Sequence, residues 1–251
     1  METVIDSAVL DRIRIKCGFT NGICCSSVGN SGGMGCWWND LAVKTHSYST
    51  HHFAADILDR NNIPLWRAIG IYGWPESGNK YKTWELMGNL KAKCTTPCIM
   101  FGDFNEVLCH AEKEGGVPRS ERCFDAFHNA IDNCGLVDLG FKGCMFTWQR
   151  GTSPASYIRE RLDRYLADDD WCTMLPNYSV RHFPIYSSDH APILLQASNY
   201  FERGRRDKMF RFEALWLSRE DCGDVISNAW KENSASDVCT RLSRCARDLT
   251  K

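Results

Sequence analysis

Short apolar runs separated by polar turns, with two longer stretches of helical spacing between them, set the pattern of this chain. Residues 66–73 (WRAIGIYG) form one apolar run, and Ile99 to Phe101 form another. Between them, residues 79–91 predict a helix with Asn79 as N-cap and with apolar side chains on one face, at Tyr81, Trp84, Met87 and Leu90. A strand, a helix and a second strand in succession favour a βαβ unit in an α/β protein.

The segments that follow predict a half of the chain that is richer in strands. A second helix is expected over residues 120–133, ending at Gly135, with an inward face made by Phe124, Phe127, Ala130 and Ile131. Short strands separated by polar turns are expected at residues 144–149, 160–167, 178–183 and 191–196. Asp168 is expected to start a short turn of helix at Trp171. The whole pattern suits a sandwich of sheets flanked by helices.

Polar side chains suited to chemistry stand at the ends of these strands. The stretch IMFGDFNEV is a buried strand followed by a turn that carries Asp103 and Asn105. Asp189 and His190 introduce the last strand, and Asp163 lies on the strand 160–167, where it can hold a histidine in one tautomer. Carboxylates for Mg²⁺, an amide for a phosphate and a histidine for proton transfer are what metal-assisted phosphodiester hydrolysis requires. The alternative for the first pair is an Asx turn that only closes a strand.

Composition indicates the cellular environment of the protein more clearly than its function. The 251 residues carry a formal net charge of -1, so any attraction to nucleic acid must be local. The 14 cysteines are scattered without a regular framework, and we expect reduced, mostly buried thiols in an intracellular protein with no signal peptide. Cys94 and Cys98 have no second pair, which disfavours a zinc site. No apolar run approaches the ~20 residues that a membrane span needs.

The last fifty residues differ from the rest in composition. Basic and aromatic residues alternate from Tyr200 to Phe212, a pattern that nucleic-acid-binding segments use but that favours a solvated linker here. Beyond it, one face of a predicted helix is apolar, at Val238, Leu242, Cys245 and Leu249. We therefore divide the chain into residues 1–198 and a basic linker with a helical tail over residues 199–251.

An ordered series of motifs resembles the endonuclease/exonuclease/phosphatase superfamily, which has the DNase I-like fold. The series is Met1-Glu2-Thr3, SGGMGCWW, IYGWPE, GDFNE, EKEGG, FTW, RLDR and SDHAPI. The phrases GDFNEV, GLVDLGFKGCMFTW and RLDRYLA most resemble the endonuclease domain of plant LINE-type (non-LTR) retrotransposons. The resemblance implies an α/β, DNase I-like four-layer sandwich of two mixed β-sheets flanked by helices. The segment FRFEALWL is similar to the one that links such endonucleases to a reverse transcriptase, a domain that does not follow here.

The resemblance also assigns catalytic roles to five residues. Tyr72 would touch the scissile phosphate through its hydroxyl group. Asp103 would activate or position the attacking water, and Asn105 would orient the phosphate. His190 would stabilise or protonate at phosphorus, with Asp163 orienting its ring.

Four further residues receive metal- or substrate-binding roles in the same way. Glu2 would be the principal Mg²⁺ ligand, with Mn²⁺ as the alternative ion, and Asp189 would lie near the metal. Thr147 and Trp148 match the Phe-Thr-Trp strand of the family, which is expected to support the wall of the substrate-binding groove.

Three functions remain open at this stage. The resemblance implies a Mg²⁺-dependent DNA endonuclease that makes single-strand nicks, acting in the nucleus and not at a membrane. Family members begin with a strand, a helix and a second strand before the Glu-Thr pair, so we expect this chain to lack the first βαβ unit. A truncated chain favours the second function, a catalytically dead retroelement remnant or binding module. The third is a phosphatase of small phosphorylated molecules, because one site in this superfamily serves several phosphoesters.

Overall fold

The computed structural model describes residues 3, 5–28, 31–153, 156–198, 221–231 and 238–249. The chain divides into two units, Met1–Tyr200 and Phe201–Lys251. Glu2 and the basic stretch 200–212, both singled out from the sequence, lie outside the described residues.

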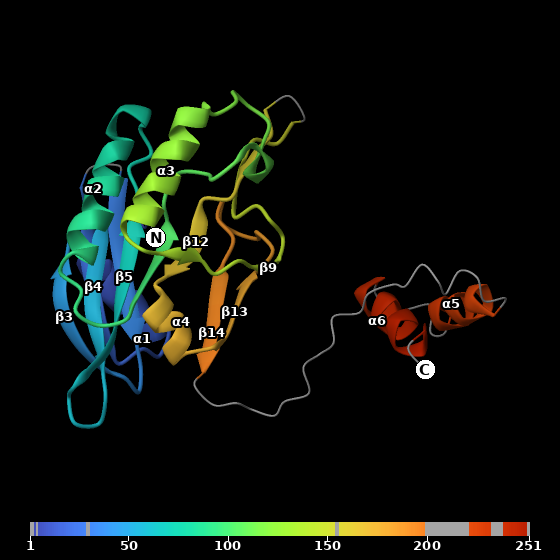
Figure 1. The fold of residues 1–251 in the computed structure, drawn as a ribbon, viewed down its shortest axis with the longest axis horizontal. Helices are drawn as coiled ribbons and strands as arrows, with labels where there is room; N and C mark the ends of the chain where they lie inside the picture. The colour runs from blue at the N-terminus through green and yellow to red at the C-terminus, as the bar shows by residue number, and fades with distance from the viewer. Residues whose placement is uncertain are drawn as a thin grey trace. The chain divides into compact units, whose positions relative to one another are not determined.

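A six-stranded mixed sheet forms the centre of the first unit (Figure 1). Its strand order is β3 (Ala42–Tyr48), β4 (His52–Leu58), β5 (Pro64–Tyr72), β6 (Cys98–Asp103), β12 (Asp163–Ala167) and β8 (Val137–Asp138). β5 and β6 are parallel, and α2 (Lys80–Lys91) connects them, which confirms the predicted βαβ unit. β12 runs antiparallel to β6 and places Asp163 opposite Asp103. The register therefore brings two predicted site residues to one end of the sheet.

Smaller sheets pack against one face of this central sheet. One is the hairpin of β1 (Asn21–Val28) and β2 (Ser31–Trp38), and another has the order β14 (Ile193–Ser198), β13 (Asn177–His182), β9 (Lys142–Gly143). A third small sheet has the order β10 (Trp148–Arg150), β11 (Ile158–Glu160), β7 (Lys113–Glu114). Met34 packs on Phe53 and Tyr72 below the hairpin, and Trp171 packs on Ile99 below β13 and β14. These contacts make the inner layer of the sandwich.

Helices cover the outer faces (Figure 1). α2 and α3 (Glu121–Asn133) pack on the central sheet. Met87 and Phe127 of the helices are buried in one cluster with Ile69 and Met100 of the strands. α1 (Ser7–Lys16) lies along β1, and α4 (Asp169–Met174) follows β12, with Asp168 capping it by accepting the Trp171 N–H. Short 3₁₀ turns span Ser77–Asn79 and His110–Glu112. The predicted α/β sandwich of mixed sheets flanked by helices is confirmed.

The structure departs from the predicted elements in three places. In α2, Met87 and Leu90 are buried as expected, but in the first turn Lys80 and Thr83 are buried and Tyr81 is exposed. Asn79 occupies the N-cap position of that helix without a side-chain hydrogen bond. The expected strand 144–149 begins only at Trp148. The hairpin of β3 and β4 was not predicted, since its polar and apolar residues do not alternate cleanly.

Within the second unit, α5 (Cys222–Lys231) and α6 (Val238–Leu249) pack on each other. Cys245 is buried there, with its Sγ 3.8 Å from the Ile226 carbonyl, whereas Leu242 of the predicted apolar stripe is exposed. No helix in the described ranges is long and apolar enough to cross a membrane. Four of the thirteen described cysteines are buried and all thirteen are free thiols, so the expectation of mostly buried cysteines is wrong.

Candidate active site

The turn after β6 holds Asp103 and Asn105 in a fixed arrangement. Asp103 is buried at the strand end, and its Oδ1 accepts the Asn105 N–H at 2.8 Å. Asn105 has a φ of 55°, a left-handed conformation that asparagine tolerates well. Its Nδ2 donates to the Gly73 carbonyl at 2.8 Å and to Asp103 Oδ2 at 3.2 Å. A Cβ at Gly73 would lie 2.4 Å from the Phe104 carbonyl oxygen, so only glycine permits this approach of the two strand ends.

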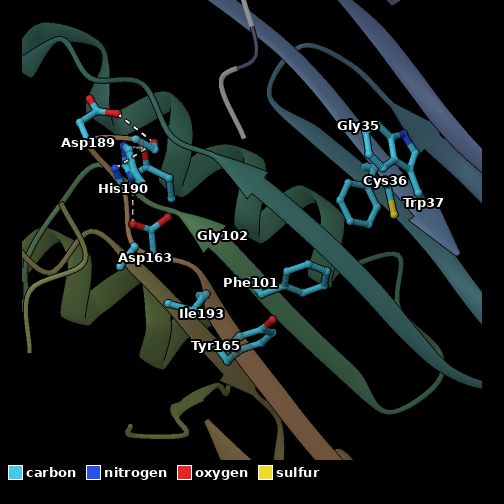
Figure 2. A pocket seen from close by; sticks show the side chains of 14 residues that line it. Gly35, Cys36, Trp37, Phe101, Gly102, Asp163, Tyr165, Asp189, His190 and Ile193 are labelled. Atoms are coloured by element: carbon cyan, nitrogen blue, oxygen red, sulfur yellow. Dashed lines mark hydrogen bonds and ion pairs between the residues drawn. The ribbon is translucent and has the colours of Figure 1, made fainter. Parts of the chain in front are cut away.

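Asp163 and His190 complete the acid and base group at this edge. The His190 Nδ1–H donates to Asp163 Oδ2 at 2.8 Å, a bond drawn as a dashed line in Figure 2. The other ring nitrogen, Nε2, lies 3.8 Å from Asp103 Oδ2. Asp163 thus fixes the tautomer and orientation of the ring and leaves Nε2 facing the second carboxylate. Acids and a histidine expected from separate strand ends are therefore brought together.

The pKa values of both Asp103 and His190 are raised above their ordinary values. Burial, followed by the charge of Asp163, raises the pKa of Asp103 to about 7. Burial disfavours a charged imidazolium, but the hydrogen bond to Asp163 and the nearby aspartate charges raise the pKa of His190 above its ordinary value. Near neutral pH, Asp103 can therefore take up a proton and a charged His190 can donate one.

The segment 147–149 connects these elements from within. The fully buried Thr147 accepts the N–H groups of Leu162 and Asp163 with its Oγ1, at 3.0 and 2.9 Å. Its carbonyl accepts the Ala191 N–H at 2.7 Å. Thr147 therefore holds both Asp163, which orients His190, and Ala191, which follows His190 in the chain.

Trp148 performs a similar task for Asp189. The indole N–H of Trp148 donates to Asp189 Oδ2 at 3.1 Å, and the Ser188 hydroxyl donates to Oδ1 at 3.3 Å. Burial opposes the charge, but the indole hydrogen bond and His190 lower the pKa of Asp189. This carboxylate stays ionised beside the histidine.

Tyr72 reaches the same edge from β5, directly opposite Asp103 in the register of the sheet. Its side chain is buried, and the ring of His51 stacks on it at 5.7 Å and on Trp74 at 3.6 Å. His51 Nδ1 also donates to the Tyr72 carbonyl at 2.8 Å. Packing against His51 and against the buried Met34 and Phe53 fixes the position of this tyrosine.

Two pockets meet at Asp103, Asp189 and His190. The larger, of about 510 Å³, is lined by aromatic side chains that include Phe53. Phe101 and Tyr165, which Figure 2 labels, also line it. The smaller, of about 370 Å³, is lined on its other side by polar and aromatic residues, Tyr72, Asn105, Arg119, Trp148 and Glu160. Eight of the nine residues predicted for the site are described, and all eight lie at or directly behind this junction.

The donor atoms at the junction suit a hard divalent cation. Asp103 and Asp189 offer carboxylate oxygens, and a bound cation would offset the burial and the nearby charge of Asp163 that raise the pKa of Asp103. Among the described residues, no group of three or more histidine, cysteine, aspartate or glutamate side chains is arranged to hold a metal. Mg²⁺ needs only one or two carboxylates when water and substrate phosphate supply the remaining ligands. The chemistry of the donors therefore fits this ion.

Three residues that the sequence did not assign to the site support it closely. Glu106 is fully buried, and its carboxylate lies 3.3 Å from both Lys80 Nζ and Arg119 Nε. Lys80 Nζ also donates to the Asn105 carbonyl, which anchors the left-handed turn. A glutamate directly after the Asp103–Asn105 turn was a visible signal in GDFNEV. The two cations lie far from this turn in the sequence, and neither position carried such a signal.

The comparisons with known proteins agree with this geometry. The sequence model of the Endonuclease/Exonuclease/phosphatase family matches residues 2–190. The endonuclease domain of TRAS1, a telomere-specific non-LTR retrotransposon, is similar in structure with a TM-score of 0.56 at 15% identity, covering 77% of this chain and 92% of that chain. The 3'-5' exonuclease NExo from Neisseria meningitidis has a TM-score of 0.55 at 18% identity, covering 78% and 86%.

A third solved structure extends the comparison. The AP endonuclease LMAP from Leishmania major has a TM-score of 0.54 at 11% identity, covering 76% of this chain and 74% of that chain. No curated protein sequence matches the chain. At these identities the structural similarities establish the fold, which is DNase I-like as the sequence predicts.

Proposed function

Because the chain belongs to the Endonuclease/Exonuclease/phosphatase family, we propose that it hydrolyses phosphodiester bonds in DNA and makes single-strand nicks by in-line attack of water. One observation carries the proposal. Asp163, His190 and Asp103 form a chain of contacts at 2.8 and 3.8 Å, and Asn105 stands on the same edge. A base, a proton donor and an amide around one junction of two pockets are the groups that phosphodiester hydrolysis needs.

Each residue has a chemical task in this reaction. Asp103, with a pKa raised to about 7, takes a proton from the attacking water. His190 donates from Nε2 to the phosphate or the leaving oxygen, and Asp163 holds its ring in position. The longer Asn105 bond, to Asp103 Oδ2, is the one that a phosphate oxygen would replace. Tyr72 would bind the scissile phosphate from the wall of the smaller pocket.

The proposal includes Mg²⁺ as the cofactor, held by Asp189 together with Glu2. Members of this family generally depend on a divalent metal. Bound Mg²⁺ would supply charge stabilisation at the phosphate oxygens. The ionised state of Asp189, maintained by Trp148 and His190, supports its assignment as a ligand.

The finer proposal is an endonuclease of the non-LTR retrotransposon type acting on nuclear DNA. It is supported by the phrases GDFNEV and RLDRYLA and is compatible with the shared fold of the TRAS1 endonuclease domain. For the organisation of the chain, we propose that residues 1–198 carry the activity and residues 199–251 form a separate linker and tail. The NExo structure bound to a product DNA hairpin offers a precedent for DNA as ligand on this fold.

Nicking of supercoiled plasmid tests the function. We expect wild-type protein with Mg²⁺ to convert supercoiled DNA to the open circle, and EDTA to abolish the conversion. His190→Gln should lower the rate at least about 100-fold, whereas His128→Gln, at an exposed histidine of α3, should match the wild type. Equal rates for the two variants, or no Mg²⁺-dependent nicking by the wild type, would refute the proposal. Hydrolysis of p-nitrophenyl phosphate without nicking would instead support the small-molecule phosphatase.

A further inference from the structure

Five charged side chains lie together behind the smaller pocket, and the catalytic steps above use none of them directly. They are Lys80, Glu106, Lys113, Arg119 and Glu160. Three cations and two carboxylates leave this cluster with one positive charge. The neighbouring catalytic group carries the opposite excess, since Asp103, Asp163 and Asp189 face a single histidine.

Arg119 is held firmly from behind. Its Nη2 donates to Glu160 Oε2 at 2.8 Å, and its Nε lies 3.3 Å from Glu106 Oε1. Both glutamates are buried, and Lys80 and Lys113 are their other partners. A guanidinium fixed by two buried carboxylates loses little further side-chain freedom when it binds a ligand.

Arg119 is also the cation of the cluster with the most exposed side chain. Its side chain is 24% exposed, compared with 9% for Lys80 and 11% for Lys113. It is the one lysine or arginine among the described residues that line the smaller pocket. No hydrogen bond or ion pair joins its Nη1 to another group in the described part of the chain. An N–H donor with a full positive charge is therefore available at the pocket wall.

We propose that Arg119 binds a backbone phosphate of the nucleic acid strand next to the phosphate that is cleaved. The proposal rests on the proposed function, because it assumes a substrate with more than one phosphate. Asp103 and Asp189 in the same pocket repel a polyanion, and a fixed cation in the pocket wall offsets this repulsion for a strand that passes it. Arginine binds phosphate through paired N–H groups, and two buried glutamates set the direction of this fork.

Binding without cleavage tests the assignment. Fluorescence anisotropy with a labelled DNA oligonucleotide in EDTA gives the dissociation constant over a series of salt concentrations. We expect Arg119→Gln to weaken binding by about 5- to 10-fold and to lower the slope of log affinity against log salt by about 1. Arg122→Gln removes an equal charge from an exposed position on α3 and should leave the slope unchanged.

Two further measurements separate binding from folding. Arg119→Lys keeps the charge that Glu106 and Glu160 require but loses the planar fork, so it should keep the salt slope and recover part of the affinity. Thermal unfolding of each variant shows that the comparison is made on folded protein. In nicking assays, Arg119→Gln should raise KM while kcat stays within about threefold.

The outcomes distinguish this inference from the function on which it rests. If wild type binds and nicks DNA, and folded Arg119→Gln has the affinity and salt slope of Arg122→Gln, the assignment of Arg119 is wrong and the proposed function stands. If wild type neither binds nor nicks DNA, both are wrong. If Arg119→Gln lowers kcat without changing affinity, Arg119 acts through the catalytic turn and not on a phosphate, which also overturns the assignment.

Discussion

Asp163 and Arg164 are neighbours on β12, and they enter two buried charged clusters of opposite character. Asp163 faces the proposed catalytic edge with Asp103 and His190. Arg164 faces the other side of the sheet, where its guanidinium donates to Glu112 Oε2 at 2.6 Å and Asp138 Oδ2 at 2.7 Å. Arg161 joins this second cluster with bonds of 2.7 and 2.9 Å to the same carboxylates. Successive side chains of a strand point to opposite faces of the sheet, and this alternation separates the two charged clusters.

The clusters differ in charge balance. In the second, two carboxylates face two arginines, and although burial opposes it, these arginines lower the pKa of both Glu112 and Asp138. In the first, acids outnumber the one histidine, and burial and Asp163 raise the pKa of Asp103. The charges of the second cluster are balanced within the protein. The first is left with a charge excess that a metal or substrate would relieve, which is typical of a functional site.

Removing Arg164 should produce the largest effect on stability. Arg164 is fully buried, so Arg164→Met leaves the buried Glu112 and the partly buried Asp138 with Arg161 as the one remaining cation of the cluster. We expect a loss of about 3–5 kcal/mol in the free energy of unfolding, measured by urea denaturation near neutral pH. As the matched control, Arg159→Met breaks an ion pair with Glu114 on the surface and should cost about 0–1 kcal/mol. If the two variants lose equal amounts of unfolding free energy, the buried network stabilises the protein no more than the surface ion pair does.

The same cluster has a defined pH dependence. Because its carboxyl pKa values are lowered in the folded state, their contribution is complete above their unfolded values of about 4. It is lost as the pH falls through the lower folded values. Urea denaturation of Arg164→Met in this acid range should therefore show a weaker dependence on pH than the wild type.

On the catalytic side of β12, the effect should fall on activity. Asp163→Asn keeps the shape of the side chain but removes the charge that orients and charges His190. We expect the nicking rate to fall by about 10²- to 10³-fold, or ~3–4 kcal/mol of transition-state stabilisation, with little change in urea denaturation. Asp125→Asn, on the exposed face of α3, is the control. If Asp163→Asn unfolds more easily but nicks DNA at the normal rate, Asp163 stabilises the fold and does not take part in catalysis.

The contrast also shows what sequence reasoning can reach. Asp103, Asn105 and His190 stand at strand ends inside recognisable motifs, so the sequence could predict that they lie together. The inward face of α3 was equally clear, because four apolar residues repeat at helical spacing over an uninterrupted helix. The site residues and the inward face of α3 were both predicted from patterns of neighbouring residues, which a single sequence contains.

Other features depend on pairings that no local pattern specifies. Arg164 and Glu112 are 52 residues apart, and the sequence marks neither as a partner of the other. Arg119 acquires its direction only from buried glutamates on separate segments. The hairpin of β3 and β4 carries mixed side chains whose burial is decided by neighbouring strands. Tertiary contacts had to be known before these could be placed.

Asp103→Asn should change stability less than Arg164→Met does, and it gives the most direct test of the comparison. Since the folded pKa of about 7 lies above the ordinary value of 3.8, folded protein holds the proton more tightly, and wild-type stability falls as the pH rises between these values. The amide removes this cost, so near pH 8 the free energy of unfolding should rise by about 1–2 kcal/mol, while near pH 3 it should not change. Nicking should be lost. Asp138→Asn, the same change in the charge-balanced cluster, should lower stability near pH 8, because it deprives Arg161 and Arg164 of a charged acceptor. Shifts of the same sign in the two variants would show that charge balance does not separate the clusters.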